Sequence, residues 1–517
     1  MTKASILPRP VGHEDRNGPE IWVDEAIWGH RLHDEQTPWL TVLEFFCVLQ
    51  AEHANGRALK EPVINALSYK PQTQLHLRNL VFNNPHIATT LAANLNDEAA
   101  WAMWHAQIKG SAGGIGNPDF SYLKDQFSSF ADFAAVIRFL QNSAIEGASN
   151  KRWSSKFVFP FGPNSLFEDV SVSAAGGVSV DRRFFARTGE LLYLMLTRSS
   201  AANALRDKLT AEFLNANLPH DRLVGALQKK TEYAGNERAG SYLPLAQYPA
   251  FDRLGEDWLA ILKLPIPIYD TTPHLVIITG LNLALYQLER AAEVANKSRP
   301  TLVCEIVGPR RSIVRDLSAD SFEHNVALPH MALERYIRQF ADTPEWQAAL
   351  QSEEPVLSAA ELLGKQFSWP EDDDLEDRTF ASPGELMVEL ERKATVRHRQ
   401  HVGKVHNVWS RAIGLSSRRS SRRVRYAPTD RLLKTLVVCC VEERLEFKLF
   451  LELLFERYGI VVGEAQAKSI IDRGAADQES FADNARRLEE RLSGLGLLRR
   501  LSDSCAYVEN PFVKAAS

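Results

Sequence analysis

The chain has 517 residues, of which 45% are hydrophobic and 24% charged, and its formal net charge is −5 at pH 7. This length exceeds a single core and predicts two to four domains, while the composition excludes a disordered or polycationic protein. The five cysteines are odd in number and form no CxxC pair, which argues against disulfide frameworks and cysteine zinc sites and favours free thiols in a reducing compartment.

The first 351 residues predict a tail and a mainly helical body of one or two domains. Residues 1–20 are rich in proline, glycine and charge, which indicates a flexible tail and no signal peptide. The most apolar run, residues 275–286, is too short to cross a membrane, so we expect a cytoplasmic protein. Within the body, residues 21–351, helices are expected at 37–49, 96–110, 127–140, 188–199, 201–215, 274–296 and 318–340.

A small β insertion is expected near residues 156–180. Residues 157–161 are rich in aromatic and β-branched side chains, residues 170–173 alternate, and two glycines at 176 and 177 predict a turn. Residues 301–307 form a further candidate for a buried strand.

The charge pattern changes sharply after the helical body. Residues 352–391 contain an acidic run flanked by prolines, which is typical of a solvated acidic linker. An alternative is that the acidic run folds over the basic tract and mimics DNA. Residues 392–429 contain eleven Lys or Arg residues and no Asp or Glu, and we interpret them as a basic arm. The alternatives for this arm are a solvated linker or a site for RNA or an acidic partner.

The densest part of the basic arm has five arginines in eight residues. Contacts between such side chains and phosphates would make nucleic-acid binding fall steeply with salt. We therefore predict nucleic-acid contacts by Arg418, Arg419, Arg422, Arg423 and Arg425.

Residues 430–517 are predicted to form a winged helix-turn-helix domain. Apolar spacing indicates two helices, the second ended by Gly459 in a left-handed C-cap, and then a short piece at 465–471. Ser480 is expected to cap a further helix, and two short strands at 497–501 and 505–509 would form the wing. The fold class is therefore mainly α with a small β insertion, multidomain, with a C-terminal winged helix-turn-helix.

The helix before a wing is the usual major-groove element of such domains. We place Asn484 and three arginines on the outward face of this helix, where arginine can contact phosphates or guanine. The predicted contact residues of this helix are Arg486, Arg487 and Arg491.

Motifs for metal binding and catalysis are weak in this sequence. The glycine-rich residues 110–116 lack the Lys-Ser/Thr pair of a phosphate-binding loop. Three histidines at 398, 401 and 406 have no carboxylate or thiol nearby in the sequence, so we interpret them as DNA contacts rather than zinc ligands.

An enzymatic site is not recognisable either. Glu305 and Asp270 are similar to a nuclease carboxylate pair, but Val307 stands where that motif has a lysine. We therefore expect no catalytic residue, no metal and no cofactor.

Three C-terminal segments, residues 456–463, 495–503 and 507–512, resemble the winged-helix ends of accessory proteins from bacterial anti-phage systems, such as restriction-like systems with methylation or backbone-modification components. The resemblance implies a subunit of a multi-protein DNA-defence complex. We therefore predict a non-catalytic accessory subunit that binds double-stranded DNA. Its N-terminal body would hold partner subunits such as an ATPase, nuclease or methyltransferase.

Two alternatives to this function stay open. In the first, the protein is a scaffold whose winged helix binds partner subunits. In the second, it is an enzyme, nuclease-like, with an unrecognised site in the N-terminal body.

Overall fold

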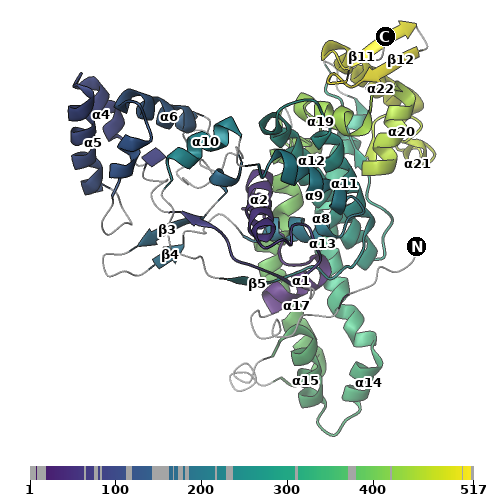
Figure 1. Cartoon of the computed structure of the whole chain (residues 1–517). Coiled ribbons are helices and arrows are strands. Elements are labelled where there is room, and N and C mark those ends of the chain that lie inside the picture. The colour runs from purple at the N-terminus through teal and green to yellow at the C-terminus, as the bar shows by residue number, and fades with distance from the viewer. Residues whose placement is uncertain are drawn as a thin grey trace.

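The computed structural model shows a mainly helical protein, as predicted from the sequence (Figure 1). Within the described residues the strands form five small sheets of two or three strands each. No helix in that part of the chain is long and apolar enough to cross a bilayer. The described residues are 7, 19–62, 66–74, 80–81, 84–111, 119–142, 162–166, 168–172, 178–180, 186–215, 218–228, 237–308, 312–370, 380–419, 422–502 and 505–513.

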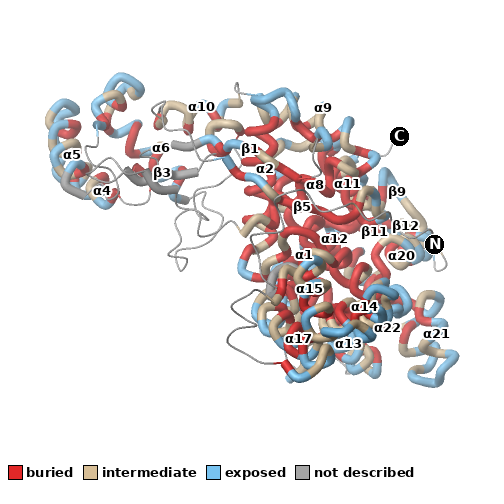
Figure 2. Tube along the Cα trace, turned by 90° about the horizontal axis from the view of Figure 1, so that it is seen from below, coloured by how far each residue is buried: buried red, intermediate tan, exposed pale blue. Residues whose placement is uncertain are grey.

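One large hydrophobic core runs through the centre of the molecule and includes residues from the first helix to the last strand (Figure 2). The helices around it in the N-terminal part of the chain are α1 (Pro19–Trp28), α2 (Pro38–Ala54), α8 (Thr188–Thr197), α9 (Ala202–Glu212), α11 (Pro249–Leu262), α12 (Ile268–Val294) and α13 (Ile313–Arg338). Helix α12 is buried on nearly every side, because its apolar residues do not keep to one stripe. It packs against α1, α2, α11 and α13 and holds the others in place.

The contact between α2 and α8 depends on a predicted helix start and on one glycine. Thr37 caps α2, with its hydroxyl accepting from the Leu40 amide at 3.4 Å, and Pro38 occupies the first turn. A Cβ on Gly189 of α8 would lie 2.4 Å from the Cβ of Glu44. Only glycine therefore allows the two helices to approach this closely.

A second, smaller core lies in a lobe to one side of the main body (Figure 1). Trp101 and Trp104 are buried there and pack edge to face, and the indole of Trp104 donates to Asn84 at 2.9 Å. These tryptophans are thus core residues of the lobe. The helices of the lobe are α4 (His86–Ala92), α5 (Asp97–Ser111), η1 (Ser121–Asp125), α6 (Phe130–Asn142), η2 (Pro163–Ser165) and α10 (Pro219–Ala226).

The predicted β insertion is present in its second half. Strand β3 (Glu168–Val172) pairs antiparallel with β4 (Val178–Val180) and parallel with β2 (Thr73–Gln74). Residues 156–161 lie outside the described residues. Strand β1 (Ala66–Tyr69) pairs antiparallel with β5 (Arg238–Tyr242).

The stretch expected to be an acidic linker and a basic arm is largely helical where it is described. Its elements and their neighbours are η3 (Gln339–Asp342), α14 (Pro344–Leu350), α15 (Pro355–Phe367), α17 (Pro383–Gln400), α18 (Val402–Ala412), β7 (Ser416–Ser417) and β8 (Arg425–Tyr426). Leu386, Leu390 and Ala394 of α17 are buried in the main core, as are Val405 and Trp409 of α18. The apolar residues at helical spacing therefore make α17 and α18 packed helices, although charged residues dominate the composition of this segment. The acidic residues 371–377 lie outside the described residues, and the division into domains stays a prediction.

The C-terminal region has the order helix, strand, helix, helix, hairpin. Its elements are α19 (Asp430–Cys440), β9 (Arg444–Glu446), α20 (Phe447–Tyr458), β10 (Ile460–Val461), α21 (Lys468–Ile471), α22 (Gln478–Gly494), β11 (Leu498–Ser502) and β12 (Cys505–Glu509). The hairpin of β11 and β12 pairs antiparallel with β9, in the sheet order β11-β12-β9. Gly459 ends α20 with φ +69°, which confirms the predicted left-handed cap. The N-cap of α22 is Asp477 rather than Ser480, because the Asp477 carboxylate accepts from the Ser480 amide at 2.6 Å.

A short parallel sheet connects this region to the body. Strand β6 (Leu302–Val303) pairs in parallel with β10. The strand is shorter than the expected 301–307, and Val307 is 55% exposed. The C-terminal region is consequently packed on the body through backbone hydrogen bonds as well as side chains.

Candidate functional site

The predicted DNA-contacting arginines of the basic arm lie on and around the hairpin of β7 and β8. Ser417 pairs with Arg425, and the chain turns between them. Arg418, Arg419 and Arg422 are exposed, and the Arg418 Nε donates to the Arg422 carbonyl at 3.2 Å. We name these three residues the hairpin arginines. Their guanidinium groups form a local concentration of positive charge on the surface.

The other two arm arginines point back to the body. Arg425 is 2% exposed and forms a buried ion pair with Glu305, and it also donates to the Arg419 carbonyl at 3.0 Å. Arg423 donates to the carboxylates of Glu323 and Asp320 on α13, and these hydrogen bonds raise its pKa above the usual range of arginine. Both side chains thus anchor the hairpin.

Glu305, the carboxylate considered for a nuclease-like pair, lies in a buried ion pair. Its carboxylate is 3% exposed and is held by Arg425, so it is the counter-ion of a buried pair. Burying either charge alone would cost several kcal/mol, but in the pair each charge is neutralised by the other.

Helix α22 uses much of its expected outward face to dock onto the body. Asn484 is 1% exposed, so its placement on an outward face is wrong. Its amide donates to the carbonyls of Cys304 and Val462 at 3.0 and 2.9 Å, and its oxygen accepts from the Ile306 amide at 2.8 Å. These three bonds join α22 to the β6–β10 junction. The sequence could not reveal this, because two of the three partners are about 180 residues away.

The three arginines predicted on α22 differ in their surroundings. Arg486 is exposed and pairs with Asp483 on its own helix. Arg487 is partly buried beside Gly308, and Arg491 donates to Asp430 at 2.6 Å and to a carbonyl at 3.1 Å. Arg486 is therefore the arginine of this set that faces solvent most fully.

Two further exposed arginines, Arg499 and Arg500, lie on β11 in the C-terminal hairpin. Arg500 donates to Glu489 at 3.0 Å. Sequence analysis did not single them out, although the alternation of a strand next to a turn could have indicated their exposure.

The three histidines near the end of α17 and in α18 have internal partners. His398 is 1% exposed and its Nδ1 lies 2.8 Å from Asp24 of α1, while burial raises the pKa of Asp24. His406 is also 1% exposed, lies 2.7 Å from the Tyr426 hydroxyl, and has its pKa lowered to about 3 by burial. The interpretation of His398 and His406 as DNA contacts is wrong, because neither side chain reaches the surface.

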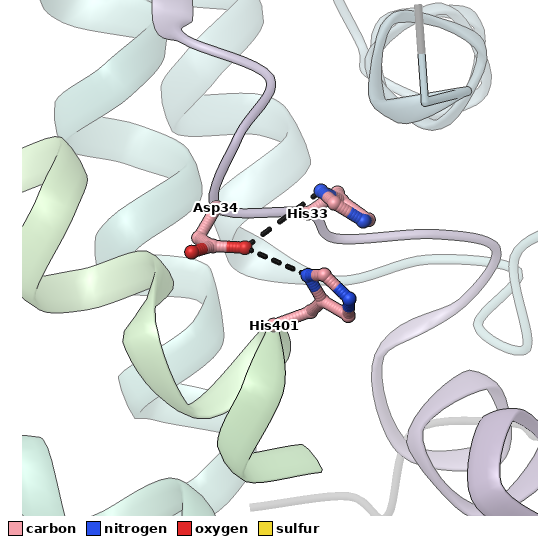
Figure 3. Close-up of side chains that lie close together, drawn as sticks. All are labelled: His33, Asp34 and His401. Atoms are coloured by element: carbon pink, nitrogen blue, oxygen red, sulfur yellow. Dashed lines mark hydrogen bonds and ion pairs between the residues drawn. The ribbon is translucent and has the colours of Figure 1, made fainter. Parts of the chain in front are cut away.

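His401 belongs to a cluster that the sequence did not indicate. Its Nδ1 lies 3.0 Å from the Asp34 carboxylate, and its ring stacks on that of His33 with 4.0 Å between centroids. Figure 3 shows both rings beside the same carboxylate oxygen. Burial lowers the pKa of His33 to about 4, and the neighbouring His401 acts in the same direction. The imidazole of His33 is thus neutral at pH 7.

The cluster borders a small pocket between α1, the loop after it and the α17–α18 junction. Titratable side chains from two distant parts of the chain meet in its wall. The lining residues with charged or titratable groups are Asp24, Glu25, Arg31, His33, Arg397 and His401. Such a convergence is a feature of functional sites, and residues separated by more than 360 positions cannot be associated by sequence spacing.

Comparison with known families gives one finding for the C-terminal region. A family model described as Methylation-associated defense system protein MAD7 matches residues 368–509, which contain α17, α18, the hairpin arginines and the chain as far as β12. This match associates the C-terminal region with a methylation-associated defence system. No curated protein and no solved structure matches the chain.

Proposed function

We propose that this protein is a non-catalytic DNA-binding subunit of a bacterial methylation-associated defence complex. The family match over residues 368–509 supports the defence system, and the three exposed hairpin arginines are the observation that carries DNA binding. Exposed arginines can bind phosphates by charge-assisted hydrogen bonds and release condensed counterions from the duplex.

The C-terminal region contributes a second DNA-contacting element in this proposal. Its order of helices, its terminal hairpin and the pairing of β12 with β9 support the proposal of a winged helix-turn-helix in this region. Because Asn484 bonds α22 to the body and Arg491 bonds it to Asp430 and Pro428, the contact surface shifts toward the exposed Arg486 and the wing. Arg499 and Arg500 would reach phosphates from that wing.

The division of roles follows from burial. Arg423 and Arg425 orient the hairpin, and Arg418, Arg419 and Arg422 contact DNA. Partner subunits of the complex, such as an ATPase, nuclease or methyltransferase, would bind the remaining surface of the body.

Binding of a labelled duplex to the full chain at a fixed, low ionic strength tests this function. The combined variant Arg418→Ala, Arg419→Ala and Arg422→Ala is expected to weaken binding at least tenfold. A control of equal charge change, with alanine at Lys109, Arg138 and Lys263, removes exposed cations of the body and is expected to bind like the parent. Truncation is unsuitable, because α17 contributes buried residues to the main core.

Absence of duplex binding would contradict the proposal and favour the scaffold alternative, which a pull-down of partner subunits would then test. One observation also supports the enzyme alternative, namely the titratable groups around the α1–α17 pocket. Cleavage of duplex DNA by the parent chain but not by a His33→Gln variant would favour that enzyme. Intact DNA after prolonged incubation with divalent metals would argue against it.

A further inference from the structure

We propose that His33, Asp34 and His401 form a binding site for one divalent transition-metal ion, with Zn²⁺ as the best-suited ion. Each residue offers one ligand atom, and the three atoms all lie within 4.8 Å of one another. Two imidazoles and one carboxylate are a donor set that suits zinc, and many zinc sites use three protein ligands plus water. This site goes beyond DNA binding and does not depend on it.

Two of the three ligand–ligand distances in the cluster lie near those expected around a tetrahedral ion. Zinc–ligand bonds of about 2.0–2.1 Å place neighbouring ligand atoms roughly 3.3 Å apart. The Asp34 Oδ1 lies 3.0 Å from the His401 Nδ1 and 3.7 Å from the His33 Nδ1. The two distances bracket the expected value (Figure 3).

The Asp34 carboxylate faces both histidines. Its Oδ1 lies 3.7 Å from the His33 Nδ1 and 3.0 Å from the His401 Nδ1. The Glu35 amide donates to the same His33 nitrogen at 3.3 Å, and binding of an ion would replace this long hydrogen bond. The two histidines also line the pocket beside α1.

An ion at this position would join distant parts of the chain. His33 and Asp34 lie in the loop after α1, whereas His401 lies at the junction of α17 and α18 within the segment matched by the family model. The ion would therefore crosslink the N-terminal body to the segment that carries the hairpin arginines. Because unfolding would separate the ligands, bound metal would stabilise this packing.

Titration of the metal-free full chain with Co²⁺ tests the site, since cobalt in a tetrahedral zinc site absorbs visible light. We expect one equivalent of Co²⁺ per chain, displacement of the absorption by Zn²⁺, and a higher unfolding temperature with metal. The variants His33→Gln, Asp34→Asn and His401→Gln are expected to weaken binding at least 100-fold. The control His324→Gln alters an exposed histidine on α13 and should bind like the parent.

Three results would overturn the proposal. The first is no uptake of Co²⁺ or Zn²⁺ by the parent chain. The second is equal affinity in the Asp34→Asn variant. The third is an unchanged unfolding temperature at saturating metal. Far-UV circular dichroism without metal identifies any variant that fails to fold. The titration of the parent chain and of the folded variants then shows whether these residues bind the metal.

Discussion

Asn484 is predicted to be the main polar link between α22 and the body. Its side chain makes three hydrogen bonds, of 2.8, 2.9 and 3.0 Å, to backbone groups of residues just after β6 and β10. A buried hydrogen bond contributes about 1 kcal/mol net, and each group left unsatisfied costs roughly 1–3 kcal/mol. Asn484→Ala should therefore destabilise the β6–β10 junction by about 3–5 kcal/mol.

Native-state hydrogen exchange measures this local stability directly. The amides of Leu302 and Cys304 bond to carbonyls of the β10 segment at 2.8 and 2.9 Å and report on opening of the junction. A loss of about 3 kcal/mol should accelerate their exchange by more than about 100-fold, because 1.4 kcal/mol corresponds to a factor of ten. Such acceleration would show that α22 is docked as described.

Two comparison variants sharpen this experiment. Asn484→Asp keeps an acceptor for the Ile306 amide but turns a carboxylate toward two carbonyl oxygens, so it should be at least as damaging as alanine. Ser493→Ala, at an exposed position of the same helix, should change stability by less than about 0.5 kcal/mol. Acceleration below about fivefold in Asn484→Ala would refute the docking of α22.

Three other perturbations test the described packing by urea unfolding. Arg425→Met leaves the Glu305 charge buried alone and should lower the free energy of unfolding by about 3–5 kcal/mol. The added change Glu305→Leu should restore much of this stability, and no recovery would contradict the buried pair. Gly189→Ala places a Cβ 2.4 Å from the Glu44 Cβ, so a loss of at least about 1–3 kcal/mol is expected and a neutral result would contradict the close approach. Burial lowers the pKa of His406 to about 3, so its contribution to stability is present above the unfolded pKa near 6.5 and is lost as pH falls toward 3. Between pH 7 and 5 the parent should lose about 2 kcal/mol more than His406→Gln, and equal losses would refute this linkage.

Local patterns predicted the individual elements well. Thr37 and Pro38 start α2 as expected, and Gly459 ends α20 in the left-handed conformation. Both features depend on backbone groups within a few residues, so the sequence alone specifies them. The mainly helical class and the strands β3 and β4 follow from similarly local periodicity.

The surroundings of charged residues could not be predicted in the same way. Arg425, Asn484 and His398 all looked like surface residues from their sequence neighbours, yet each is buried. Their partners Glu305, Cys304 and Asp24 lie 120 to 374 positions away, so only the tertiary fold brings them together. A high density of charge in sequence therefore identifies a tract that differs from the body, but it does not show which cations remain on the surface.

The salt dependence of duplex binding tests the central claim most directly. The logarithm of the binding constant falls with the logarithm of salt by about 0.9 per phosphate contacted. Replacing the three hairpin arginines by alanine should therefore reduce the slope by about 2.7, whereas the control variant at Lys109, Arg138 and Lys263 should keep the parent slope. Equal slopes for parent and hairpin variant would contradict the account, because the hairpin would then contact no DNA.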